Sequence, residues 1–170
     1  MGGSIQGLGY GIAIDVGGDI HATGSFFGTA DFDPGPDTFN LTSSGGSDVF
    51  VSQLDSNGDF VRAQRMGGTG NDQVSGIVVD ASGNVHTTGS FRDTMDFDPG
   101  PGAFNLTSRG NADVFVSKLS NPTSVGETTS EIGDDSGSSA GTIIGVSAAA
   151  AIVVALVASG IWYSRRRRQA

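Results

Sequence analysis

Several residue types that common functions depend on are absent or scarce in this chain of 170 residues. Cysteine is absent, which excludes a disulfide scaffold, a thiolate metal site and a cysteine nucleophile. Proline occurs only five times and there is no Gly-x-y period, so the 28 glycines do not indicate collagen. With only two histidines, the chain offers little material for catalysis. We therefore expect no enzyme activity and no cofactor.

Positive charge is also scarce, except at the very end of the chain. Residues 1–164 hold all 18 acidic residues and five of the nine basic ones, giving 5 − 18 = −13. Binding to phosphate backbones needs clustered lysine and arginine, so this acidic body excludes a nucleic acid as partner. The remaining four basic residues are consecutive: Arg165, Arg166, Arg167 and Arg168.

The chain contains an internal repeat of 65 residues. Residues 1–55 and 66–120 align without a gap and are identical at 31 of 55 positions. The runs shared by the two copies include His-x-Thr-Gly-Ser-Phe, Asp-Phe-Asp-Pro-Gly-Pro and Asp-Val-Phe-Val-Ser. We place the first repeat at 1–65 and a second, incomplete repeat at 66–120.

Each repeat is expected to form four β-strands. In the second copy, strands are predicted over 76–79, 85–91 and 113–119, with a turn over 80–84 in which glycine and asparagine can adopt positive φ. The fourth strand is predicted over 60–65, and the Asp-Pro-Gly-Pro segment is expected to form a loop or small hairpin. No helical period occurs in the first 120 residues, so the repeat region is expected to be all-β.

The runs beginning at Asp80 and Asp113, with their copies at Asp15 and Asp48, resemble the bacterial seven-bladed β-propeller repeat family. This resemblance implies β-propeller blades of four strands per unit. A blade buries its faces against neighbouring blades, and propellers contain about 4–8 of them. We therefore expect further blades in the same chain or in other chains, including self-association through the repeats. Met1 aligns with Met66, so we also expect that the chain begins inside a longer array.

A hydrophobic segment follows the repeats. Residues 121–141 form a Ser-, Thr-, Gly- and acid-rich stretch that reads as a flexible stalk. Residues 142–163 carry no charge, and a helix of this length spans about 33 Å, enough for the ~30 Å hydrocarbon core. We predict one C-terminal transmembrane α-helix there, with Trp162 and Tyr163 at the interface. A buried helix of a soluble domain is the alternative.

The orientation of this helix follows from the arginines. The positive-inside rule places the basic tail, residues 164–170, in the cytoplasm and the repeats outside the cell or in an organelle lumen, which requires a signal peptide upstream. The alternative is a tail-anchored protein with its repeats in the cytosol. Gly141 and Gly145 form a G-x-x-x-G pattern that could bring two such helices together. The partners expected are therefore the lipid bilayer, an unknown extracellular or lumenal ligand, and a second copy of the chain.

Other motifs have both a functional and a structural interpretation. Asn40 and Asn105 match the glycosylation pattern, or else bond within a strand or turn. The pairs Asp31/Asp33 and Asp96/Asp98 are weak Ca²⁺ candidates, because Ca²⁺ takes six to eight oxygens; turn chemistry is the alternative. The turn 55–59 has the same two interpretations. We interpret His21 and His86 as strand packing residues, and the G-x-S-x-G match at 137–141 as chance.

Together these features indicate a single-pass membrane protein that displays a β-propeller-type repeat region for binding or adhesion. The alternatives are a membrane-anchored propeller hydrolase or lyase whose catalytic blades lie elsewhere, and a non-functional truncated product.

Overall fold

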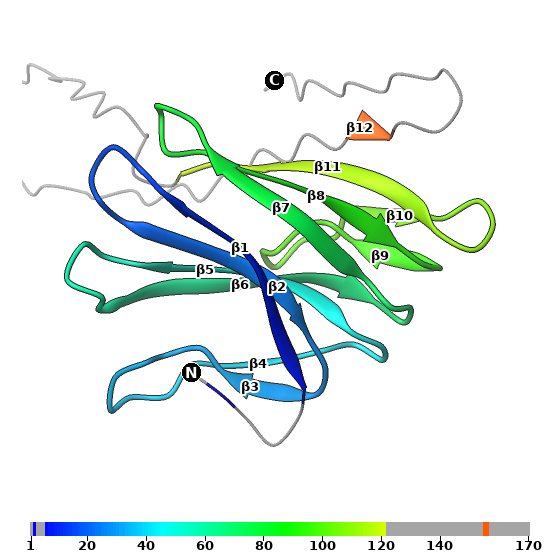
Figure 1. Ribbon diagram of the computed structural model, residues 1–170. Coiled ribbons are helices and arrows are strands. Elements are labelled where there is room, and N and C mark those ends of the chain that lie inside the picture. The colour runs from blue at the N-terminus through cyan, green and yellow to red at the C-terminus, as the bar shows by residue number, and fades with distance from the viewer. Residues whose placement is uncertain (1, 3–5, 122–154, 157–170) are drawn as a thin grey trace, which may run out of the picture.

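The structure is a computed structural model that describes residues 2, 6–121 and 155–156. The described part is all-β and contains no helix (Figure 1). Its strands are β1 (Gly7–Ile14), β2 (Ile20–Phe26), β3 (Thr29–Asp31), β4 (Asn40–Thr42), β5 (Asp48–Leu54), β6 (Phe60–Gly68), β7 (Gln73–Val79), β8 (Val85–Phe91), β9 (Thr94–Asp96), β10 (Asn105–Thr107), β11 (Asp113–Leu119) and β12 (Ala155–Leu156). The predicted all-β repeat region is thereby confirmed.

The strands form three antiparallel sheets. The largest has the order β1-β2-β5-β6-β9-β10, and the second has the order β12-β11-β8-β7. The hairpin β3-β4 forms the third sheet. We call the strands β1 to β6 unit 1 and the strands β7 to β11 unit 2.

The sequence repeat is reproduced in the strands. Adding 65 to the bounds of β2 (Ile20–Phe26) gives those of β8 (Val85–Phe91), and the same shift turns β5 (Asp48–Leu54) into β11 (Asp113–Leu119). The repeat also holds for pairing at the hairpins. Gly2 forms a bridge with Asp31, as Gly67 pairs with Asp96.

The strands predicted over 85–91 and 113–119 coincide with β8 and β11. Those predicted over 76–79 and 60–65 are longer, as β7 and β6. The predicted small hairpin is present twice, as β3-β4 and β9-β10.

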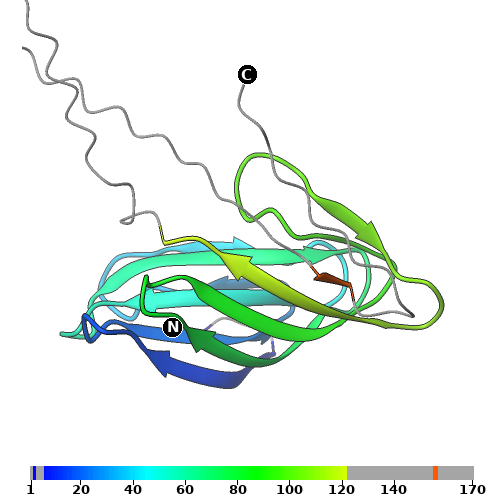
Figure 2. The same cartoon turned by 90° about the horizontal axis from the view of Figure 1, so that it is seen from above.

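The two units pack face to face (Figure 1). Val49, Val51 and Met66 of unit 1 share one buried cluster with residues of unit 2, among them Val74, Phe91 and Phe115. Viewed from above, the strands of both units run roughly along one axis (Figure 2). The burial of apolar side chains between the sheets is the main source of stability for such an arrangement.

The hairpins close the two apolar clusters with a phenylalanine. Phe97 is fully buried, and its ring centroid lies 5.3 Å from that of Phe91 and 5.3 Å from that of Phe115. Phe32 occupies the equivalent place in unit 1, at 5.3 Å from Phe26 and 4.9 Å from Phe50. The β9-β10 hairpin also pairs with β6, so it joins unit 2 to unit 1. The hairpin β3-β4 lies on the opposite side of unit 1 (Figure 1).

The predicted transmembrane helix over 142–163 lies outside the described residues, apart from Ala155 and Leu156. These two residues pair with Val116 and Phe115 at the outer edge of β11. Within the ranges that the structure describes, no helix is long and apolar enough to cross a membrane.

Candidate functional site

Three turns of the same construction begin with an aspartate. Oδ1 of Asp80 accepts hydrogen bonds from the N–H groups of Ser82 (2.9 Å) and Asn84 (3.0 Å). The third residue after the aspartate is a glycine with positive φ, which is 77° at Gly83. Glycine reaches this region without a steric penalty, so the turn needs it there. The turns 15–19 and 55–59 repeat the two hydrogen bonds and the glycine.

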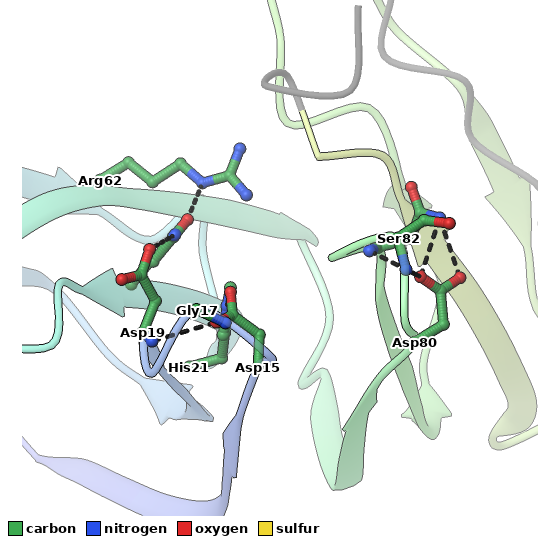
Figure 3. Close-up of polar contacts among 9 residues, drawn as sticks. Asp15, Gly17, Asp19, His21, Arg62, Asp80 and Ser82 are labelled. Atoms are coloured by element: carbon green, nitrogen blue, oxygen red, sulfur yellow. Dashed lines mark hydrogen bonds and ion pairs between the residues drawn. The ribbon is translucent and has the colours of Figure 1, made fainter.

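In two of these turns, the first aspartate also contacts a histidine of the strand that follows. Nε2 of His21 lies 3.1 Å from Oδ2 of Asp15 (Figure 3). Nε2 of His86 lies 3.1 Å from Oδ2 of Asp80. The hydrogen bond from His21 is the main cause that lowers the pKa of Asp15. Asp80 also accepts from the side chain of Asn84, which is the largest cause of its strongly lowered pKa. The histidines therefore fix turns, a role that goes beyond the strand packing we had predicted.

A series of side-chain hydrogen bonds connects one of these turns to β6. Nε2 of Gln53 donates to Oδ2 of Asp19 (2.8 Å), and Nε of Arg62 donates to Oε1 of Gln53 (2.8 Å) (Figure 3). Burial lowers the pKa of Arg62. These side-chain hydrogen bonds connect the turn 15–19 to β5 and β6.

Asp48 is a buried carboxylate at the junction of the two units. Its Oδ2 accepts hydrogen bonds from the N–H of Ser44 (2.9 Å) and from the guanidinium of Arg65. Burial raises the pKa of Asp48, and the hydrogen bond from Arg65 opposes that rise. The Oδ1 atom has no hydrogen-bond partner among the described residues.

The Asp48 carboxylate lies directly on the backbone of Gly67. A Cβ at Gly67 would come within 2.1 Å of the Cγ of Asp48. The neighbouring Gly68 is equally enclosed, because a Cβ there would meet the carbonyl oxygen of Thr94 at 1.8 Å. Only glycine fits at these two positions, which accounts for the two glycines at the end of β6.

Asp72 is a second fully buried carboxylate at the same junction. Its Oδ2 accepts from the N–H of Gly68 (3.0 Å) and its Oδ1 from the N–H of Arg92 (3.2 Å). Burial is the largest cause that raises the pKa of Asp72 to about 6, and the negative charge of Asp48 adds to it. Asp72 thus links the end of unit 1 to the β8–β9 corner of unit 2.

The Asp-x-Asp segments are used within their hairpins. Oδ1 of Asp31 accepts from the N–H groups of Asp33 (3.0 Å) and Phe39 (2.9 Å), and the hydrogen bond from Phe39 is the main cause that lowers its pKa. Asp96 binds Asp98 and Phe104 in the same way. No group of three acidic or histidine side chains in the described part is placed to hold a metal ion. Calcium binding at these pairs stays a prediction.

An open hollow of about 330 Å³ lies beside the first of these hairpins. It is lined by the loop 33–37 and by Gly58, Asp59 and Phe60 of the neighbouring turn. Three of the lining residues are aspartates, namely Asp33, Asp37 and Asp59. This rim of the molecule is therefore acidic.

The two glycosylation candidates are exposed. Asn40 begins β4 and Asn105 begins β10, each opposite an aspartate of its hairpin. The hydroxyls of Thr42 and Thr107 bond across the hairpins to Thr29 and Thr94, each at 2.8 Å. Use of these asparagines as glycosylation sites stays a prediction.

The remaining predicted site residues lie outside the described residues. They are the topology residues Trp162, Tyr163, Arg165, Arg166, Arg167 and Arg168, and the helix-packing candidates Gly141 and Gly145. The stalk over 121–141 is described only at Asn121.

The two buried aspartates at the junction, Asp48 and Asp72, are not among the site residues predicted from the sequence. Asp48 stands in a repeated run, and an acid repeated before Val-Phe-Val could have drawn attention to that position. Asp72 aligns with Gly7, so the repeat carries no signal for it.

No protein-family model matches the chain, and no curated protein matches it.

Proposed function

We propose that the chain is a binding module in which two β-propeller-type blades are displayed from a membrane anchor. Blades are antiparallel sheets that bury their faces against one another in series. The face-to-face packing of two sheets whose strands repeat every 65 residues is the observation that carries this proposal. The resemblance of the runs at Asp80 and Asp113 to the bacterial seven-bladed repeat family also supports it.

The repeat units suit binding because their loops are held rigidly. The aspartate turns and the hairpins are fixed by side-chain to backbone hydrogen bonds and by buried phenylalanines. Rigid loops on a repeat scaffold present a surface at little cost in entropy. The acidic rim around Asp33, Asp37 and Asp59 is the part of that surface with a defined chemical character.

In this proposal, the predicted transmembrane helix over 142–163 anchors the repeats to the membrane. Its uncharged length and the four arginines that follow support a single pass with the repeats outside or lumenal and the C-terminus in the cytoplasm.

Cysteine labelling tests the display directly, because the chain has no cysteine of its own. Thr38 is exposed in the first hairpin loop, and Ala170 ends the chain. In intact cells, an impermeant maleimide is expected to label Thr38→Cys of a cell-surface protein and to label Ala170→Cys only after permeabilisation. For repeats in an organelle lumen, permeabilising the plasma membrane alone is expected to expose Ala170→Cys and to leave Thr38→Cys protected. The reverse pattern, or recovery of the full chain in the soluble fraction, would refute the proposal.

A further inference from the structure

One face of the repeat unit is covered in unit 1 and bare in unit 2. We call it the valine face; it is formed by Val49, Val51 and Thr23 in unit 1 and by Val114, Val116 and Thr88 in unit 2. Val49 and Val51 are 0% and 5% exposed, because unit 2 packs on them. Their repeat equivalents Val114 and Val116 are 51% and 39% exposed.

The opposite face of the repeat unit is partly buried in unit 2 and exposed in unit 1. We call it the isoleucine face; it carries Ile77 and Val79 in unit 2 and Ile12 and Ile14 in unit 1. Ile77 and Val79 are partly buried against the shared cluster. Ile12 and Ile14, at the same repeat positions, are 69% and 66% exposed. Each of the two surfaces that form the internal interface therefore occurs a second time in the chain. No described element covers either of these second copies.

The internal interface also shows how the two faces fit. The Cγ2 of Ile77 would lie 2.9 Å from a Cβ at Gly11, beside the Cγ2 of Thr23. The missing side chain of Gly11 thus leaves room for Ile77. The equivalent glycine of unit 2 is Gly76, where the nearest atom to a Cβ would be the Cγ2 of Thr88 at 4.0 Å. Unit 2 therefore has the same space for an isoleucine side chain above Gly76, and no described residue fills it.

We propose that the valine face of unit 2 binds the isoleucine face of unit 1 of a second copy of this chain. Ile12 of one copy lies over Gly76 and Thr88 of the next, as Ile77 lies over Gly11 and Thr23 within the chain. One end of the valine face is charged, because His86 and Lys118 lie there at 3.1 and 3.7 Å from Asp80. This inference stands on the packing of the repeats and goes beyond the proposed function.

Because the two faces differ, the contact is heterologous and copies join head to tail. Heterologous contacts give rings where the rotation closes and filaments where it does not. With the two described units in each copy and about 4–8 blades in a propeller, a closed ring would contain roughly two to four copies. A head-to-tail contact can also be blocked from either side, which makes it testable by mixing.

The test is the mass of the full chain in detergent, measured by sedimentation velocity. Ile12→Glu blocks the isoleucine face and Val116→Glu blocks the valine face, and both positions are exposed, so each variant is expected to fold. We expect assemblies of two or more chains for the unsubstituted protein and single chains for each variant alone. An equimolar mixture of the two variants is expected to form a dimer and nothing larger, because each variant retains one complementary face.

Two controls keep the outcome unambiguous. Gly141→Leu with Gly145→Leu disrupts the packing pattern of the predicted anchor, and assembly is expected to persist in that variant. Ile12→Cys with Thr88→Cys, in a chain without native cysteine, is expected to give cross-linked ladders with a short bismaleimide, while each single substitution gives none. An unsubstituted chain that stays single at every concentration, or a mixture of the glutamate variants that stays at one chain, would overturn the proposal.

Discussion

Val51 and Val116 occupy the same position of the 65-residue repeat, yet Val51 is 5% exposed and Val116 is 39% exposed. The two valines stand in the same sequence, Asp-Val-Phe-Val-Ser, on equivalent strands. Their different burial is caused by what packs on them, since unit 2 covers unit 1 and no described element covers unit 2 in the same way. The repeat therefore provides matched pairs of sites for testing the packing.

The pair Val49 and Val114 measures the energy of this packing. Val49→Ala removes two methyl groups from a fully buried site and is expected to lower the free energy of unfolding by about 2 kcal/mol. Val114→Ala makes the same change at a half-exposed site and is expected to cost less than ~0.5 kcal/mol. Urea unfolding of dilute protein checks both values. Equal losses would show that the valine face of unit 2 is covered in the single chain.

The hairpin phenylalanines are expected to be among the most sensitive positions. Phe97 is fully buried against Phe91 and Phe115, so Phe97→Ala should cost about 3–5 kcal/mol. Phe27 is 47% exposed and serves as the control, because Phe27→Ala empties no buried site. Thermal unfolding followed by circular dichroism measures the difference. A small effect at Phe97 would mean that the hairpin does not close the cluster.

Gly67 is expected to tolerate no side chain. A Cβ there would lie 2.1 Å from the Cγ of the buried Asp48, so Gly67→Ala should destabilise the protein by about 1–3 kcal/mol through overpacking. At Gly9 a Cβ would meet nothing within 4 Å, and Gly9→Ala is expected to be nearly neutral. Chemical denaturation of the two alanine variants, compared with the unsubstituted chain, distinguishes the sites.

Aspartates with raised pKa values and aspartates with lowered pKa values are expected to give stability opposite dependences on pH. The pKa of Asp72 is about 6 in the folded chain against an ordinary value of 3.8, so the folded state binds the additional proton between these values. Asp72 therefore makes the protein more stable as the pH falls from 7 towards 5. Asp15, Asp31, Asp55 and Asp80 have lowered pKa values, so their contribution is present above about pH 4 and is lost as the pH falls further.

Asp72→Asn tests this assignment. The variant is expected to show a smaller increase in stability between pH 7 and 5, because Asp48 also has a raised pKa, and to keep the loss below pH 4, as measured by the urea midpoint across the pH range. A variant with the same pH profile as the unsubstituted chain would show that Asp72 does not carry the buried proton.

Local sequence was sufficient to predict the strands and the turns. Strand β8 was predicted directly after the Asp-x-x-Gly-Asn turn, and the turn itself depends on Gly83, whose conformational freedom is a property of the residue. The small hairpin followed from Asp-Pro-Gly-Pro. In each case the chemistry that shapes the element lies within a few residues.

The burial of the faces and the junction aspartates could not be predicted in this way. Val49 and Val114 have the same neighbours in sequence, so nothing local distinguishes the buried one from the exposed one. Asp72 accepts its hydrogen bonds from Gly68 and Arg92, and its raised pKa comes from the packing of unit 2 on unit 1. Such properties arise only when the units come together.

Cysteine reactivity at one matched pair tests the packing of the two units most directly. Thr23 is fully buried beneath unit 2, and its equivalent Thr88 is exposed. In the Ile12→Glu background, where assembly between chains is blocked, Thr23→Cys is expected to react with a maleimide only through unfolding, and Thr88→Cys at close to the rate of a free thiol. Equal and rapid labelling at both positions would show that unit 2 does not cover unit 1 and would contradict the account.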